Sequence, residues 1–201
     1  DLTTSSLYVL MERAQTDWNK EIKRRKLAKK FYKESEIISI LKQLSRGLLF
    51  LQKHKIAHRD IKPQNILIFP NDIYKIADMG EAKEIDKNKK QMATLRGSEL
   101  FMSPILYEGL KLNHKDIKHN PYKSDMFSLG LCFLYAICLN LKVLEYIREM
   151  KDMNSIKYIL DIFLDKNRYS DKLIEIIFRM IEPQEDKRID FEELEIKLIN
   201  F

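Results

Sequence analysis

The sequence predicts a mainly α-helical fold of the α+β type, with one small β-hairpin among the helices. Three observations support this prediction. Apolar residues recur every three or four positions in four segments, which is the spacing of amphipathic helices. A fifth segment is apolar nearly all round, as expected of a helix in the middle of a protein. Two short β-type runs stand on either side of a turn signal.

The first half of the chain contains one long amphipathic segment, at residues 34–53. The β-type runs at residues 66–69 (ILIF) and 73–77 (IYKIA) predict the hairpin. An earlier apolar run at residues 7–10 (LYVL) predicts a short strand. Residues 81–98 have no sustained period and many charges, which predicts a mobile loop.

The second half of the chain predicts the buried helix at Ser124–Leu139. Amphipathic helices are expected at Ser155–Leu164, Ser170–Ile181 and Asp190–Ile199, and the last begins with the spacing of a capping box, Asp190 followed by Glu193. The sequence has no internal repeat and no linker of domain scale. Its 201 residues therefore predict one domain with a single core.

The net charge of +6 raises the question of a nucleic-acid partner, because much of the excess lies at Lys20–Lys33. No zinc-ligand spacing, aromatic RNA-binding signature or helix-turn-helix glycine turn accompanies this stretch, which argues against nucleic acid. We interpret the stretch as the solvated face of a helix, with a docking surface for an acidic or phosphorylated partner as the alternative.

The sequence predicts no membrane segment. The longest apolar run, Leu129–Leu141, is interrupted by Asn140 and is too short, and the first residues lack the features of a signal peptide. Cys132 and Cys138 lie six positions apart in a predicted helix, so they point to different faces and are not expected to form a disulfide. We expect an intracellular, cytoplasmic protein.

Four short motifs occur in a fixed order along the chain. They are HRDIKPQN at residues 58–65, DMG at 78–80, GSELFMSP at 97–104 and KSDMFSLG at 123–130. A single HxD motif is common by chance, but the ordered set resembles the eukaryotic-type serine/threonine protein kinase catalytic domain. The resemblance covers the hinge and large lobe of that domain and implies a protein-kinase-like fold for this lobe.

The resemblance implies transfer of the γ-phosphoryl group of ATP to a hydroxyl of a protein substrate. Asp60 would accept or orient the hydroxyl proton, and Lys62 would place a cation against the transferred group. Asn65 and Asp78 offer hard oxygen ligands of the kind that Mg²⁺ prefers. The simpler interpretation, that Asp60 and Asn65 only cap turns, explains either residue but not the whole spacing. A lysine two residues after the aspartate is the serine/threonine pattern.

Further positions match the family along the chain. In LYVLMERA, Met11, Glu12 and Ala14 match the hinge that contacts adenine, and Leu67 matches the residue beneath the base. His58 belongs to the structural core of the catalytic loop. Asp125 matches the aspartate that holds the loop backbone, although it could instead be the N-cap of the buried helix. Arg188 matches the arginine that fixes the end of the activation segment.

The activation segment, from Asp78 to about Pro104, resembles one regulated by phosphorylation. Thr94 stands where many members carry an activating phosphate, and Arg59 and Lys83 would form its cationic pocket. The alternative is that Thr94 is simply an exposed loop residue. Ser98 matches the position that contacts the catalytic aspartate and lysine.

The sequence departs from the family in three places. Met79 replaces the phenylalanine of D-F-G, and we expect it to fill the same apolar slot. The A-P-E glutamate is missing, which would leave Arg188 poorly paired, and we suggest Glu108 as its replacement. No glycine-rich loop and no V-A-I-K lysine occur in these residues, so the small lobe is not among them.

We therefore expect residues 1–201 to be the hinge and large lobe of a protein kinase domain, taken from a longer protein and inactive by themselves. The alternative is a pseudokinase-like scaffold or protein-binding module. Met79 and the missing glutamate keep that alternative open.

Overall fold

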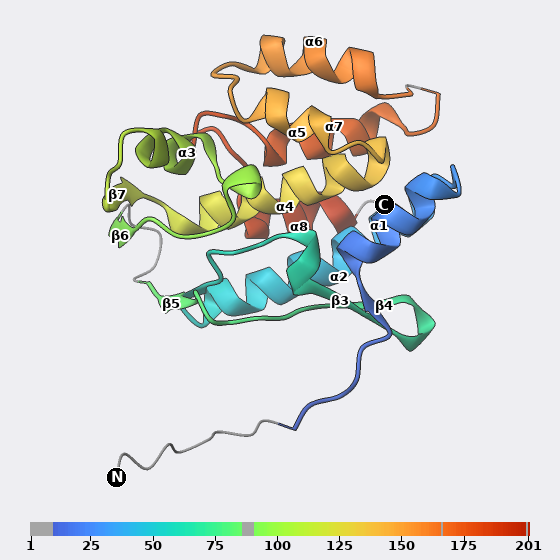
Figure 1. Ribbon diagram of the computed structural model, residues 1–201, viewed down its shortest axis with the longest axis horizontal. Coiled ribbons are helices and arrows are strands. Elements are labelled where there is room, and N and C mark those ends of the chain that lie inside the picture. The colour runs from blue at the N-terminus through green and yellow to red at the C-terminus, as the bar shows by residue number, and fades with distance from the viewer. Residues whose placement is uncertain (1–9, 86–90, 166, 200) are drawn as a thin grey trace.

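A computed structural model describes residues 10–85, 91–165, 167–199 and 201 and shows a helical lobe built around one central helix, α4 (Figure 1). The helices are α1 (Trp18–Leu27), α2 (Glu34–Lys53), α3 (Pro104–Lys111), α4 (Pro121–Cys138), α5 (Lys142–Ile147), α6 (Met153–Phe163), α7 (Asp171–Met180) and α8 (Phe191–Ile199). The strands are β1 (Thr16–Asp17), β2 (Ile56–Ala57), β3 (Ile66–Phe69), β4 (Ile73–Ile76), β5 (Lys83–Glu84), β6 (Gln91–Thr94) and β7 (Asp116–His119). Three single-turn 3₁₀ helices are η1 (Pro63–Asn65), η2 (Pro70–Asp72) and η3 (Glu99–Phe101).

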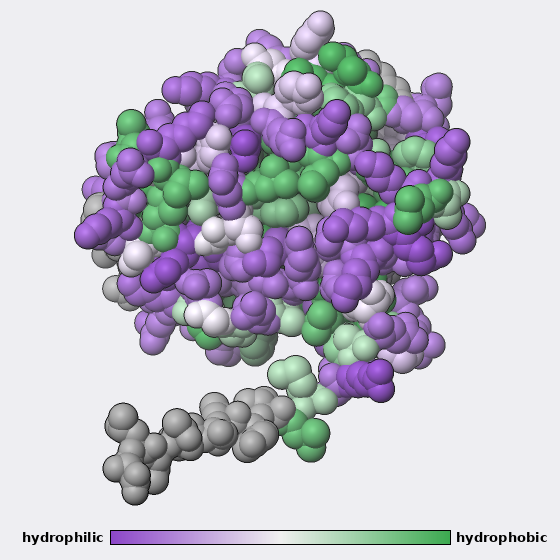
Figure 2. Space-filling view, in the orientation of Figure 1, coloured by the Kyte–Doolittle hydropathy of each residue, from purple (hydrophilic) through white to green (hydrophobic). Residues whose placement is uncertain are grey.

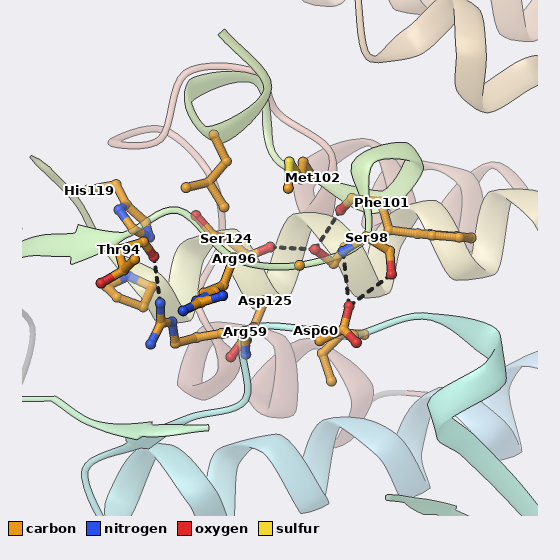
Figure 3. A pocket seen from close by; sticks show the side chains of 15 residues that line it. Arg59, Asp60, Thr94, Arg96, Ser98, Phe101, Met102, His119, Ser124 and Asp125 are labelled. Carbon is orange, nitrogen blue, oxygen red and sulfur yellow. Dashed lines mark hydrogen bonds between the residues drawn. The ribbon is translucent and has the colours of Figure 1, made fainter. Parts of the chain in front are cut away.

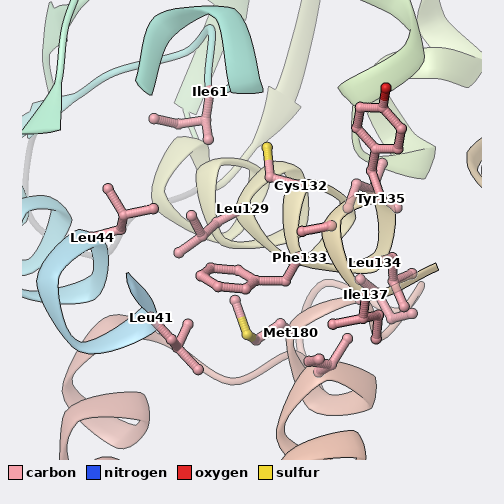
Figure 4. Packing of buried hydrophobic residues seen from close by; sticks show 14 of the residues in the cluster. Leu41, Leu44, Ile61, Leu129, Cys132, Phe133, Leu134, Tyr135, Ile137 and Met180 are labelled. Carbon is pink, nitrogen blue, oxygen red and sulfur yellow. The ribbon is translucent and has the colours of Figure 1, made fainter. Parts of the chain in front are cut away.

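The core forms around α4, in which every residue except Lys123 is buried. Figure 4 shows Phe133 of this helix among side chains from α2 and α7. Helix α4 comes close to the end of α7 at Gly130, because a Cβ there would lie 3.4 Å from the backbone of Met180 and 2.6 Å from the side chain of Ile181, the C-cap of α7. The all-round apolar pattern of this segment is therefore explained by its burial on every side, as predicted.

The helix predictions agree with the structure to within a few residues. The segment predicted at residues 34–53 is α2, and those predicted after residue 150 are α6, α7 and α8. The capping box of α8 is formed, since Glu193 N–H donates to Asp190 (2.8 Å) and Asp190 N–H donates to Glu193 (2.9 Å). The basic stretch forms α1 and the turn that follows it. The short helices α3 and α5 were not predicted, because neither is long enough to show a helical period.

Two sequence predictions about the middle of the chain need correction. Helix α4 begins at Pro121, with Asn120 as its N-cap, so the alternative N-cap role of Asp125 is wrong. The segment predicted as a loop at residues 81–98 contains β5 and β6, which pair with β2 and β7. In each pair the partner strand lies far away in the sequence, so no local pattern predicts β5 or β6.

The predicted hairpin is present as β3 and β4, and β1 adds a third antiparallel strand beside β3. Most of the strand predicted at residues 7–10 lies outside the described residues. Cys132 and Cys138 are both buried and unpaired, as predicted. No helix in the part of the chain that the structure describes combines the length and apolar character needed to span a membrane.

Candidate functional site

The loop at residues 58–65 joins β2 to β3 and is attached to α4 by one side chain. The two carboxylate oxygens of Asp125 accept the backbone N–H groups of His58 and Arg59, each at 2.8 Å. Arg59 has a φ of +70°, which a non-glycine residue adopts at a cost. The buried carboxylate therefore fixes a strained turn immediately before the polar residues of the loop.

Asp125 performs this task in a buried environment. Its side chain is nearly inaccessible, and burial raises its pKa to about 6, against the opposing effect of the two backbone hydrogen bonds. At neutral pH the group is mainly ionised and can accept both N–H groups.

The buried side chain of His58 joins the loop to the segment that carries Asp78. Its Nδ1 accepts the N–H of Asp60 at 3.3 Å, which places the proton on Nε2, 3.0 Å from the carbonyl oxygen of Ala77. The N–H of Ala77 in turn donates to the carbonyl of Asn65 at 2.8 Å. These bonds hold the Asp60 loop and the Asp78 loop side by side.

The carboxylate of Asp60 is the centre of the site (Figure 3). Its Oδ2 accepts from Lys62 Nζ at 2.6 Å and from Asn65 Nδ2 at 3.1 Å. Its Oδ1 accepts the backbone N–H and the hydroxyl of Ser98, at 2.9 and 3.0 Å. Lys62 also donates to the Ser98 hydroxyl at 2.9 Å. The structure thus brings three further predicted residues together around the Asp60 carboxylate.

The side chains of Asn65 and Asp78 fit a Mg²⁺ ion. Since Asn65 Nδ2 donates to Asp60, its carbonyl oxygen is the atom that remains for a cation. Asp78 is exposed at the end of the neighbouring loop, and one of its oxygens accepts the N–H of Gly80. Mg²⁺ typically takes one or two protein oxygens and completes its shell with phosphates and water. No group of three or more His, Cys, Asp or Glu side chains suited to another metal occurs in the described ranges.

The residues predicted to contact adenine lie in the segment before β1 and in β3. Met11 is exposed, and the side chain of Glu12 pairs with Lys75 of β4. Ala14 is half-buried one residue before Gln15, whose N–H donates to Ile68 at 2.8 Å. Leu67 is half-buried at the centre of β3. The structure thus places Leu67 in the central strand of the small sheet and the other three positions in the segment before β1.

The predicted phosphate site at Thr94 is only partly assembled. Thr94 is exposed at the end of β6, and its carbonyl accepts a hydrogen bond from Arg59 at 2.5 Å. Lys83 lies on β5 and contributes nothing to this pocket, whose basic side chains besides Arg59 are Arg96 and His119 (Figure 3). The sequence did not point to Arg96 or His119. His119 lies on β7 and comes close to Arg59 because β7 pairs with β6.

Burial determines the charge state of this pocket. It lowers the pKa of Arg59, against the attraction of Glu81 and Asp125, and it lowers the pKa of His119. His119 is therefore neutral at physiological pH, and Arg59 and Arg96 supply the positive charge.

Of two sequence expectations about unusual residues, one stays a prediction and one is wrong. Met79 is 45% exposed and lines an apolar pocket with Leu44, Leu51 and Ile76, so its role in place of the D-F-G phenylalanine stays a prediction. Glu108 does not replace the missing glutamate, because it is exposed and lies 3.6 Å from Lys151.

Arg188 is well partnered, although by different groups than expected. Its guanidinium donates to the carbonyls of Glu182, Lys123 and Pro183 at 2.7, 2.7 and 3.1 Å, and it lies over the ring of Phe127 at 4.8 Å. Burial lowers its pKa to about 10, opposed by the charges of Glu185 and Glu182. Backbone carbonyls therefore accept the hydrogen bonds that a carboxylate partner was expected to accept.

Comparison with known proteins identifies the same family each time. The family model described as protein kinase domain matches residues 2–197. The serine/threonine-protein kinase Nek4 of Mus musculus is 31% identical over 77% of this chain and 18% of its own length. Nek2 of Homo sapiens is 28% identical over 96% of this chain and 43% of its own. The dual specificity protein kinase zak2 of Dictyostelium discoideum is 32% identical over 81% and 23%. The chain spans less than half the length of these curated relatives.

Proposed function

Because the chain belongs to the protein kinase domain family, we propose that it forms the hinge and large lobe of a serine/threonine kinase. The complete enzyme would transfer the γ-phosphoryl group of ATP to a serine or threonine hydroxyl of a protein substrate. The observation that carries the proposal is the Asp60 carboxylate, held in place by Lys62, Asn65 and Ser98. A scaffold without activity would not need a charged cluster of this kind, which is costly to order.

Phosphoryl transfer requires mainly position and countercharge from the protein. The Oδ atoms of Asp60 would accept the proton of the substrate hydroxyl in place of the one that Ser98 now donates. Lys62 is already 2.6 Å from that carboxylate, so its ammonium group would stand between the base and the transferred phosphoryl group. Asp125 acts through the loop backbone and is a positioning residue.

ATP and Mg²⁺ are the cofactors that this family uses, and we assign their contacts as follows. Asn65 and Asp78 would hold Mg²⁺, which supplies countercharge to the phosphates when bound. The backbone of Glu12 and Ala14 would bond the adenine, with Met11 and Leu67 beside it. The glycine-rich loop that covers the phosphates is not encoded in these residues, so a small lobe from elsewhere would complete the site. The two unpaired, buried cysteines support a reducing, intracellular location.

Removing the Asp78 carboxylate tests the metal assignment. In the full-length protein, Asp78→Ala should reduce phosphorylation of a generic protein substrate by at least about a hundredfold, because the main anionic Mg²⁺ ligand is lost. The measurement is transfer of labelled phosphate at increasing Mg²⁺ concentration. Asp72→Ala, at another exposed aspartate close to β4, is the matched control and should retain full activity. Full activity in the Asp78 variant would contradict the assignment.

We also propose that phosphorylation of Thr94 raises activity, with Arg59 and Arg96 as the groups that bind the phosphate. One new charge-assisted hydrogen bond is worth about 1.5 kcal/mol, so Thr94→Ala should lower the activity of the phosphorylated protein about tenfold. Phosphatase treatment should lower the activity of the parent equally and leave the variant unchanged. Equal activities of the treated and untreated parent would show that Thr94 is an ordinary exposed threonine.

A further inference from the structure

The end of α1 and the turn that follows it carry four exposed lysines, which we call the lysine patch: Lys23, Lys26, Lys29 and Lys30. None of the four forms an ion pair with any residue the structure describes. The neighbouring cations differ, because Lys20 pairs with Asp17, and Arg24 and Arg25 both pair with Glu21. Glu21, the one acidic residue of α1, and Asp17, its N-cap, are thus already paired, and the patch carries uncompensated positive charge.

An exposed leucine lies within the lysine patch. Helix α1 buries Trp18, Ile22 and Arg25, and its outer side presents Lys23 and Leu27. Leu27 is 87% exposed, although it is as apolar as the buried residues of the same helix. A partner that covered Leu27 would remove this apolar surface from water and would meet lysine side chains around it.

The backbone beneath the patch is fixed. Lys29 N–H donates to the carbonyl of Lys26 at 3.1 Å, and Lys30 N–H donates to that of Arg25 at 2.9 Å. Lys29 adopts a φ of +52° in this turn. The base of the turn is held by Arg25, which donates to Glu36 of α2 at 2.6 Å. A ligand would therefore bind to lysines whose backbone is already ordered, which reduces the entropy lost on binding.

The helix that carries the patch starts close to the candidate active site. Helix α1 packs against η1, the turn that contains Asn65 and directly follows Lys62. From there the helix runs outward (Figure 1), and the face of the molecule shown in Figure 2 is mostly hydrophilic, with smaller apolar patches. A ten-residue helix is about 15 Å long, which an extended peptide spans with about four or five residues. A peptide with its hydroxyl at Asp60 could continue along α1.

We propose that the lysine patch binds an acidic stretch of the protein substrate, about four or five residues long, with an apolar residue against Leu27. This inference rests on the proposed kinase function. A nucleic acid is a poorer match, because Phe31 is only half-exposed and Arg168 covers its ring at 4.0 Å, leaving no aromatic surface for bases to stack on. A single exposed leucine is also too little apolar surface for stable insertion into a membrane.

Binding of a labelled peptide with glutamates on both sides of a leucine tests the surface directly. We expect Lys26→Glu combined with Lys29→Glu to weaken binding about tenfold or more, and added salt to weaken binding to the parent. The matched control combines Lys53→Glu with Lys55→Glu. Lys53 lies in the last turn of α2 as Lys26 does in α1, and Lys55 has a positive φ as Lys29 does. Equal loss in both double variants would overturn the proposal, as would tighter binding of RNA or anionic vesicles than of the peptide.

Phosphorylation by the full-length protein separates this inference from the proposed function. We expect a serine peptide with the acidic stretch to have a KM about tenfold below that of a peptide with glutamines in those positions, and the Lys26/Lys29 double variant to abolish this difference. Phosphorylation of both peptides with the same KM would refute the role of the patch and leave the kinase function intact. Binding of the acidic peptide without phosphorylation of any peptide would refute the kinase function and leave the surface intact.

Discussion

Asp60→Asn is expected to abolish phosphorylation by the full-length protein while the lobe remains folded. An amide cannot accept the hydroxyl proton, and loss of a positioned general base typically lowers the rate about 10²- to 10⁴-fold. The fold should tolerate the change, because Asp60 lies in a loop, and its own N–H bond to His58 comes from the backbone. Initial rates of phosphate transfer and a thermal melting curve, measured on the same preparation, provide both readings.

Ser98→Ala is the comparison for this prediction. It removes the hydroxyl that donates to Asp60 and accepts from Lys62, but it keeps the Ser98 backbone N–H on the same carboxylate. We expect a loss of activity well below that of Asp60→Asn, since the base itself remains. If Asp60→Asn retained the parent rate, or lost activity only because it unfolded, the role assigned to the carboxylate would be wrong.

Arg188→Met is expected to have the largest effect on stability, a loss of about 3–5 kcal/mol in the free energy of unfolding. The substitution leaves three partly buried carbonyl oxygens without the guanidinium that now donates to them. One of these belongs to Lys123 in the first turn of α4, so the lost contact loosens the N-terminal end of the central helix. Urea-induced unfolding measures the change.

Two variants that each remove one partner of an exposed ion pair serve as controls for this prediction. Arg179→Met removes an exposed arginine that pairs with Glu175 one turn away, and Glu108→Gln removes the exposed partner of Lys151. Exposed pairs contribute little, so each variant should lose less than about 1 kcal/mol. If Glu108→Gln were as damaging as Arg188→Met, the carboxylate and not the carbonyls would be what Arg188 requires.

The arrangement of the candidate catalytic residues could be predicted from the sequence, because these residues lie in short, fixed spacings. Asp60, Lys62 and Asn65 lie in one loop, and the following hairpin brings Asp78 beside it, so local order largely determines their geometry. The long helices were predictable for a similar reason, since each shows its apolar face within its own segment.

The parts that were missed depend on contacts between remote segments. The partners of Arg188 are backbone carbonyls, which every residue carries and no sequence pattern identifies. Strands β6 and β7 pair with Thr94 opposite Asp116, which brings His119 and Arg96 to the Arg59 pocket. Neither β6 nor β7 can be recognised from its own sequence without the other.

The central claim is that this lobe, within its full-length protein, directs phosphate to a serine or threonine hydroxyl through Asp60. The most direct measurement is the transfer of γ-labelled phosphate from ATP to a mixed protein substrate, followed by identification of the labelled amino acid. We predict label on serine or threonine for the parent and none above background for Asp60→Asn. Absence of transfer by the parent, or equal labelling by the Asp60 variant, would contradict the claim.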